Sequence, residues 1–201
     1  MHARNIEKFI KNKVVLKSLK KAPLGKIGKK FMTIKENAPN CNLIYGPAYK
    51  GIPLCISTAI ALSARLNHNI GYFFNRKEKK THGDQGTLVG QFPLASDSVV
   101  MVADVITDGL TKIESVKLIR ELCKVEFSGV IVALDRMEKN SQANDAITEF
   151  QQKTGVPVWS IITIRETCEY LKNREIGGSV VLDEPTFLKI ENYLAEHSVR
   201  S

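Results

Sequence analysis

Cysteine is scarce in this sequence, and its arrangement does not indicate a metal or disulfide framework. The 201 residues include four cysteines, Cys41, Cys55, Cys123 and Cys168. None of them stands at the spacing of a metal-binding pair, and a chain of this length builds an apolar core without disulfides. We therefore expect four reduced thiols, mostly buried as small apolar groups.

Long hydrophobic runs are also missing. No apolar run approaches the roughly 20 residues of a membrane-spanning helix, and residues 1–8 carry no apolar region of the signal-peptide kind. The composition, 43% hydrophobic and 25% charged, is ordinary for a soluble globular protein. We expect a cytoplasmic protein with a single domain over residues 1–201, made of an N-terminal helix and basic segment (1–40), a core (41–170) and C-terminal helices (171–201).

Acidic residues are outnumbered by basic ones, which gives a formal net charge of +8. The excess is concentrated in residues 11–35 and 76–80. Basic clusters bind polyanions, including nucleic acids and small polyphosphates, and they also occur as plain solvated surface. No helix-turn-helix or RNA-binding aromatic motif accompanies these clusters. We therefore expect neither nucleic acid nor a membrane as a partner.

The most informative stretch runs from Ser98 to Thr111. Its short apolar run, Val99–Val102, is typical of a buried strand in a parallel sheet. The chain then passes through Asp104 into a turn that contains Gly109, and a helical pattern begins near Lys112. Such a turn binds anions, because free backbone N–H groups and the helix dipole point at the ligand. In open α/β folds it lies at the carboxyl edge of the sheet, where ligands bind.

A second strand–loop–helix unit precedes this one. The apolar run Asn42–Tyr45 leads into a loop, Gly46–Pro53, and a helix with apolar residues at 54–66 follows. Glycine lets backbone N–H groups approach a ligand closely, so this loop also suits an anion. The segment Asn75–Thr87 is charged and has few apolar residues, and we expect a mobile loop there.

The rest of the chain alternates strands with helices. Further strands are expected at 71–74, 129–136 and 156–163, and order resumes at 88–89 after the loop. Helices are expected at 5–19, from 112 onward, at 141–153, 164–173 and 185–196. Residues 26–39 are ambiguous, and a short strand with Phe31, Thr33 and Ile34 is one interpretation. The inward helix faces carry Ile113, Val116 and Ile119 and, further on, Ala143, Ile147 and Phe150. This alternation predicts an α/β fold with a mostly parallel central sheet flanked by helices. We expect Trp159 to pack rather than to offer a stacking platform.

The segment Val99–Thr111 resembles the diphosphosugar-binding motif of the type I phosphoribosyltransferases. Two further segments are similar to one branch of that class, the orotate phosphoribosyltransferases: GPAYKGIP at 46–53 and FNRKEKKTHGDQGTLVG at 74–90. The strand ending Leu134–Arg136 also matches. The resemblance extends continuously over about residues 42–170, and it implies the type I fold with a short N-terminal hood region.

The reaction of that family joins orotate to phosphoribosyl pyrophosphate. It yields orotidine 5′-phosphate and pyrophosphate in pyrimidine (UMP) biosynthesis, with Mg²⁺ on the sugar diphosphate. The transition state resembles an oxocarbenium ion, so catalysis mainly stabilises charge on the departing pyrophosphate, and a closing loop excludes water. Part of that loop reaches into the neighbouring subunit's site in the family, which implies a homodimer with shared active sites.

The resemblance also implies roles for individual residues. Lys50 and the backbone around Tyr49 would hold pyrophosphate, and Asp104 would lie near the ribose hydroxyls. The Mg²⁺ would be held by the substrate, with Asp104 as its candidate contact from the protein. Arg136 would pair with orotate through its planar fork of donors, and Lys17 would contact orotate from the N-terminal segment. The matching positions of the pyrophosphate loop are Arg76, Lys77, Lys80 and His82. Thr107, Gly109 and Thr111 would cradle the 5′-phosphate, within a substrate-binding stretch that comprises Asp104, Val105, Ile106, Thr107, Asp108, Gly109, Leu110 and Thr111. Catalytic roles fall to Lys77, Lys80, His82 and Asp104.

Plainer interpretations exist for three of these residues. Lys50 is also compatible with an ordinary loop lysine, and His82 with a surface histidine. Arg136 is also compatible with a structural pair with Asp135. The matching residues around each of them favour the functional interpretation.

Three departures from the family pattern bear on activity. Ala103 stands where the motif usually carries its first acid. Asp108 places a negative charge where a dianionic phosphate binds, unless its side chain caps the following helix, and Leu110 removes a hydroxyl donor. In the N-terminal segment, Leu24 and Gly25 stand where aromatic residues are expected.

Two functions are compatible with these departures. The first is an orotate phosphoribosyltransferase, active alone or with a partner subunit. The second is a catalytically impaired relative that serves as a regulatory or scaffold subunit. We favour the enzyme, because the cations of the pyrophosphate loop have little reason to persist in a scaffold.

Overall fold

The computed structural model describes residues 33–66, 69–76, 87–107 and 109–199. The predicted helix at 5–19 and most of the predicted loop at 75–87 lie outside these ranges. So do five of the predicted site residues, Lys17, Lys77, Lys80, His82 and Asp108.

Six strands of the described chain form one sheet in the order β3-β2-β1-β4-β5-β6. Neighbouring strands are parallel, except for the antiparallel pair of β2 and β3. The strands are β1 Leu43–Tyr45, β2 Gly71–Asn75, β3 Leu88–Gly90, β4 Ser98–Ala103, β5 Glu126–Asp135 and β6 Val158–Thr163. The predicted α/β fold with a mostly parallel sheet is confirmed. The strands β1 and β4, predicted from short apolar runs, lie side by side at its centre.

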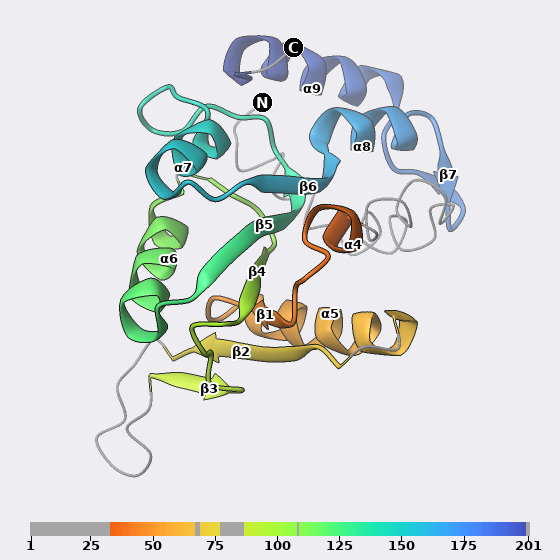
Figure 1. The fold of residues 1–201 in the computed structure, drawn as a ribbon. Helices are drawn as coiled ribbons and strands as arrows, with labels where there is room; N and C mark the ends of the chain where they lie inside the picture. Colours follow the sequence, from red (N-terminus) through yellow and green to blue (C-terminus); the bar gives the residue numbers. More distant parts are fainter. Residues whose placement is uncertain (1–32, 67–68, 77–86, 108, 200–201) are drawn as a thin grey trace.

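Helices cover both faces of the sheet (Figure 1). They are α4 Thr33–Asn37, α5 Gly51–Leu66, α6 Leu110–Cys123, α7 Ala146–Thr154, α8 Ile164–Leu171 and α9 Glu184–His197. Alternate residues of β4 point to opposite faces, so Val99 and Met101 pack against α6 and α7 while Val100 and Val102 pack against α4 and α5. The apolar face predicted for α6, with Ile113, Val116 and Ile119, is buried in the first of these two clusters.

A third apolar cluster joins α8 and α9 beyond the edge strand β6. Along the chain, α8 and α9 are connected by a segment that contains a small hairpin, β7 Glu175–Ile176 and β8 Ser179–Val180. Its turn is Gly177–Gly178, with both residues at positive φ, a conformation that glycine adopts at no steric cost. The hairpin was not predicted from the sequence. The helix at Pro185 was predicted, and Asp183 caps its first turn by accepting from the Thr186 N–H.

Two local predictions were wrong. Thr33 and Ile34 lie in the helix α4 and not in a strand. The helix predicted from residue 141 begins at Ala146, because Asp145 caps it there by accepting from the Ile147 N–H at 3.0 Å. Ala143 therefore lies before the helix with φ of 61° and is exposed, although we expected it to point inward.

Two side-chain predictions were right. All four cysteines are buried and free. Trp159 packs over β5, where a Cβ on Gly129 would lie 2.0 Å from the indole ring. Within the described ranges, no helix is long and apolar enough to cross a membrane.

Candidate active site

Three loops meet at the carboxyl edge of the sheet. They follow the adjacent parallel strands β1, β4 and β5, whose registers bring Tyr45 beside Met101 and Ala103 beside Val132. The loops are 46–50, 104–109 and 136–145. This edge is where open α/β sheets bind their ligands.

The loop after β1 is closed tightly upon itself by its two glycines. A Cβ on Gly46 would lie 2.2 Å from the Gly51 carbonyl oxygen, and a Cβ on Gly51 would lie 2.7 Å from the Gly46 carbonyl carbon. The Gly51 N–H also donates to the Pro47 carbonyl at 3.0 Å. Only glycine permits this close backbone approach. Lys50 therefore projects from a compact turn, 69% exposed to solvent.

Asn75 ties this turn to the neighbouring strand β2. Its Oδ1 accepts from the Tyr45 hydroxyl at 2.8 Å and from the Ala48 N–H at 3.2 Å. The peptide bond between Ala48 and Tyr49 is cis. One residue after Asn75, the Arg76 N–H donates to the Thr87 carbonyl at 2.8 Å. The two ends of the predicted pyrophosphate loop are thus joined beside the turn that carries Lys50.

Lys50 and Asp104, predicted on separate motifs, form an ion pair. The Lys50 Nζ lies 3.1 Å from the Asp104 Oδ2, and Asp104 is 39% exposed. A pair this exposed contributes roughly 0–1 kcal/mol, because water screens it. Exchanging Asp104 for another anion at the Lys50 ammonium therefore costs little energy. The Asp104 carbonyl accepts from the Leu134 N–H at 3.0 Å, which fixes its backbone against β5.

Gly109 forms the predicted phosphate turn. It has φ of +75°, is buried, and is the N-cap residue of α6, where a glycine has no side chain to accept from the first N–H groups. The Lys112 and Ile113 N–H groups donate back to its carbonyl at 3.0 and 2.9 Å. The first N–H groups of a helix have no acceptor within the helix, so they attract an anion. Around this turn Ile106 is buried, Val105 is half-buried, and Thr107, Leu110 and Thr111 are exposed.

Arg136 lies at the end of β5 and pairs with Glu138. The Nη2–Oε2 distance is 2.5 Å, and the two side chains are only 13% and 17% exposed. Asp135, the partner that the sequence suggested, accepts from the Met137 N–H at 2.8 Å. Arg136 and Thr107 line the same pocket, of about 190 Å³. The structure thus brings the predicted base-binding arginine to the predicted phosphate turn.

The same pocket contains residues that the sequence did not indicate. Glu138, Lys139, Asn140 and Ser141 line it from the loop after β5. The one sequence signal that could have found any of them is the position of Glu138, two residues beyond Arg136 on a loop at the carboxyl edge.

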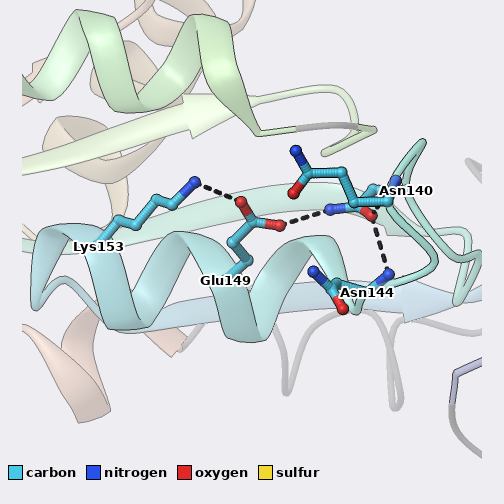
Figure 2. A network of polar contacts seen from close by, with 5 residues as sticks. Asn140, Asn144, Glu149 and Lys153 are labelled. Carbon is cyan, nitrogen blue, oxygen red and sulfur yellow. Dashed lines mark hydrogen bonds and ion pairs between the residues drawn. The ribbon is translucent and has the colours of Figure 1, made fainter.

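Asn140 braces that loop against α7. Figure 2 shows Glu149 between Asn140 and Lys153, and the Asn140 Nδ2 donates to the Glu149 Oε2 at 2.6 Å. The Asn140 Oδ1 in turn accepts from the Gln142 and Asn144 N–H groups, both at 2.9 Å. The hydrogen bond from Lys153 holds the pKa of Glu149 below its usual range, so this carboxylate stays ionised at neutral pH. The network gives the pocket a fixed wall.

The cysteines do not supply a nucleophile. Burial raises the pKa of Cys41 and Cys55 to about 11 and that of Cys168 to about 12. Their thiols stay protonated at neutral pH, and a protonated thiol is a poor nucleophile.

Asp104 is the carboxylate predicted from the sequence as a candidate contact for Mg²⁺. In the part of the chain that the structure describes, no three His, Cys, Asp or Glu side chains gather at one point. Mg²⁺ commonly binds through one or two carboxylates together with substrate phosphates. One exposed acid beside the phosphate turn fits a Mg²⁺ that enters on a diphosphate, and it does not fit a metal cage built by the protein alone.

Comparisons with known proteins narrow the class. No protein-family model matches the chain. It is 38% identical over 168 residues to an orotate phosphoribosyltransferase of Clostridium beijerinckii. The aligned residues cover 83% of this chain and 75% of that protein. It is 43% identical over 152 residues to the orotate phosphoribosyltransferase of Methylococcus capsulatus, covering 75% and 70%. The crystal structure of the Francisella tularensis orotate phosphoribosyltransferase superposes with a TM-score of 0.66 at 25% identity, covering 86% of this chain and 78% of that one.

The parallel sheet, the glycine-closed turn after β1 and the acid-to-glycine turn after β4 define a type I phosphoribosyltransferase. The extent and identity of the similarity to the bacterial relatives are far beyond what a shared fold alone produces. The chain belongs to the orotate phosphoribosyltransferase family.

Proposed function

We propose that this chain transfers the phosphoribosyl group of phosphoribosyl pyrophosphate to orotate. The products are orotidine 5′-phosphate and pyrophosphate, and the reaction belongs to pyrimidine (UMP) biosynthesis. The observation that carries the proposal is the meeting of three loops at one edge of the sheet. There Lys50 pairs with Asp104, and Thr107 shares a pocket with Arg136.

In this reaction the bond from the ribose C1 to pyrophosphate breaks and a bond from C1 to an orotate ring nitrogen forms. Negative charge grows on the leaving pyrophosphate, and Lys50 is placed to stabilise it by exchanging Asp104 for a phosphate oxygen. The loop residues Arg76, Lys77, Lys80 and His82 are proposed to add cations from the same side. Asp104, once released, accepts hydrogen bonds from the ribose hydroxyls.

The remaining substrate groups are assigned to the other two loops. The 5′-phosphate binds at the turn from Val105 to Thr111, where the N-terminus of α6 offers N–H donors. The orotate carboxylate binds Arg136, whose planar fork suits a carboxylate. Lys17 is proposed to contact orotate from the N-terminal segment. Mg²⁺ bound on the diphosphate would neutralise charge on the leaving group, and Asp104 would be its contact from the protein.

A homodimer follows from the same proposal. The pyrophosphate loop begins and ends beside the Lys50 turn, where the Arg76 N–H meets the Thr87 carbonyl. In the family, part of this loop serves the neighbouring subunit's site. We propose the same sharing here, in a cytoplasmic enzyme.

The test is the consumption of orotate by the purified protein, followed by ultraviolet absorbance with phosphoribosyl pyrophosphate and Mg²⁺. We expect turnover, and a Lys77→Ala variant purified in parallel should lose it, which excludes a contaminating enzyme. Binding of phosphoribosyl pyrophosphate without any turnover would instead support the regulatory or scaffold subunit, for which the missing acid at Ala103 is the specific reason.

A further inference from the structure

The Arg136–Glu138 pair is enclosed more tightly than pairing alone requires. Both side chains are less than one-fifth exposed, and only the Nη2 of Arg136 is engaged by Glu138. The Arg136 Nε is buried, and no acceptor for it lies among the described residues. A buried donor without a partner is costly. The Arg136 side chain lines the pocket that Thr107 also lines, so a ligand bound there contacts this guanidinium.

Glu138 is itself held from a distant part of the chain. Its Oε2 faces Arg136, while its Oε1 accepts from the Tyr193 hydroxyl of α9 at 3.3 Å. Each carboxylate oxygen therefore has its own partner. Burial and the nearby Glu138 charge raise the pKa of Tyr193, so its phenol stays protonated and remains a donor.

Tyr193 is fixed in turn by the end of α9. Its ring stacks on His197, with centroids 4.3 Å apart and planes within 3°. The backbone joins the same two elements, because the Lys139 N–H donates to the His197 carbonyl at 2.9 Å and the Val199 N–H donates to the Met137 carbonyl at 3.1 Å. The loop that carries Glu138 and the end of α9 thus form one braced unit.

A second arginine–glutamate pair in the molecule shows which features of the Arg136–Glu138 pair are shared and which are its own. Arg165 of α8 pairs with Glu191 of α9 at 3.0 Å, and its Nε also lacks an acceptor among the described residues. That pair is about one-third exposed, and neither residue lines the pocket of Arg136. An unpaired Nε is therefore not in itself a sign of a site. What sets Arg136 apart is the pocket, the deeper burial and the tyrosine behind its partner.

We propose that Glu138 is a positioning residue for orotate binding, and that Tyr193 holds it in that role. Glu138 fixes the plane of the Arg136 guanidinium, so that the donors it leaves unused face the planar acid. The inference rests on the proposed function, because it takes orotate as the acceptor. It adds two residues to the site, one of them on the C-terminal helix.

The experiment compares Glu138→Gln, Tyr193→Phe and Glu191→Gln by steady-state kinetics and thermal unfolding. Glu138→Gln keeps the shape of the side chain and should raise the KM for orotate about tenfold, the loss of one charge-assisted contact. The KM for phosphoribosyl pyrophosphate should stay within about twofold. Tyr193→Phe keeps the stack on His197 and should raise the orotate KM by about threefold. Glu191→Gln removes the same charge from α9 and should leave both KM values unchanged.

The proposal is overturned if Glu138→Gln binds orotate as the wild type does, or if both KM values rise together with a lower melting temperature. Should Glu138→Gln fail to fold, Tyr193→Phe decides the matter by the same split between the two substrates. If the wild-type protein shows no turnover, the proposed function fails by itself. Orotate binding is then measured by calorimetry. The inference requires that the wild type binds orotate and that Glu138→Gln binds it more weakly.

Discussion

The two ends of the candidate site are built in opposite ways. At one end Lys50 and Asp104 form an exposed pair of side chains on two loops. At the other end Arg136 and Glu138 form an enclosed pair, braced by α9 through Tyr193. Both pairs join one cation to one carboxylate at about 3 Å or less. They differ in burial and in what stands behind the carboxylate.

The difference matches what each end has to do. A departing pyrophosphate changes its charge and its position during the reaction, so its cations must exchange partners at little cost, and an exposed pair allows this. A planar base must be held in one orientation, and a guanidinium fixed by a buried partner is prearranged for it. The molecule thus divides its site into an adaptable end and a rigid end.

The largest effect is expected at the rigid end. Arg136→Ala leaves Glu138 buried without its counter-charge, which should lower the free energy of unfolding by about 3–5 kcal/mol and kcat/KM for orotate by roughly a thousandfold. Urea unfolding and steady-state kinetics measure the two. The double variant Arg136→Ala with Glu138→Ala should regain most of the stability and none of the activity. A double variant that is no more stable than the single one would show that the pair is not enclosed as described.

Ala103 lies between the two ends, and its surroundings in the structure change the effect that we expect from replacing it with aspartate. The family pattern suggests that Ala103→Asp restores a missing acid. Here Ala103 is 5% exposed and packed in the apolar cluster with Met101 and Phe150. A carboxyl group there should cost about 2–4 kcal/mol of unfolding free energy without raising turnover. A variant as stable as the wild type with faster turnover would show that position 103 opens toward the ligand.

The adaptable end should respond in activity and not in stability. Lys50→Ala removes one charge-assisted contact to phosphate, so kcat/KM for phosphoribosyl pyrophosphate should fall about 30-fold. The free energy of unfolding should change by less than about 1 kcal/mol, because the pair with Asp104 is exposed. Kinetics together with denaturant unfolding tests both. A large loss of stability would place this pair with the rigid end.

The smallest effect is expected at the phosphate turn. Leu110 is 52% exposed at the start of α6, so Leu110→Thr should change stability by less than about 0.5 kcal/mol. The added hydroxyl should lower the KM for phosphoribosyl pyrophosphate about threefold, since one added hydrogen bond typically contributes roughly 0.5–1.5 kcal/mol. Leu110→Val, which has no hydroxyl, is the matched control. An unchanged KM in Leu110→Thr would mean that the phosphate does not contact this position.

Sequence patterns predicted the elements that depend on local order. The continuous apolar run of β4 indicated a strand covered on both faces, and Gly109 indicated the turn that follows. Sheet topology and the family resemblance then placed Lys50 and Asp104 at one edge, and the structure joins them at 3.1 Å. These features were accessible because each is determined by neighbouring residues or by the end of a strand.

What the sequence did not indicate depends on contacts between distant residues. Glu138 and Tyr193 are 55 positions apart, and no pattern in either segment predicts their contact. The start of α7 was placed too early because the Asn140 side chain holds the preceding residues in a turn, which delays the helix to the Asp145 cap. The first case is a contact between side chains of distant segments, and the second is a side chain that competes with the local propensity of the backbone.

The most direct test of the account measures product formation from orotate and phosphoribosyl pyrophosphate with Mg²⁺, for the wild type beside Lys50→Ala and Arg136→Ala. We expect the wild type to form orotidine 5′-phosphate. Lys50→Ala should lose efficiency toward phosphoribosyl pyrophosphate, and Arg136→Ala toward orotate, each with a smaller effect on the other substrate. A wild type that forms no product would contradict the proposed function, and two variants that impair both substrates equally would contradict the division of the site.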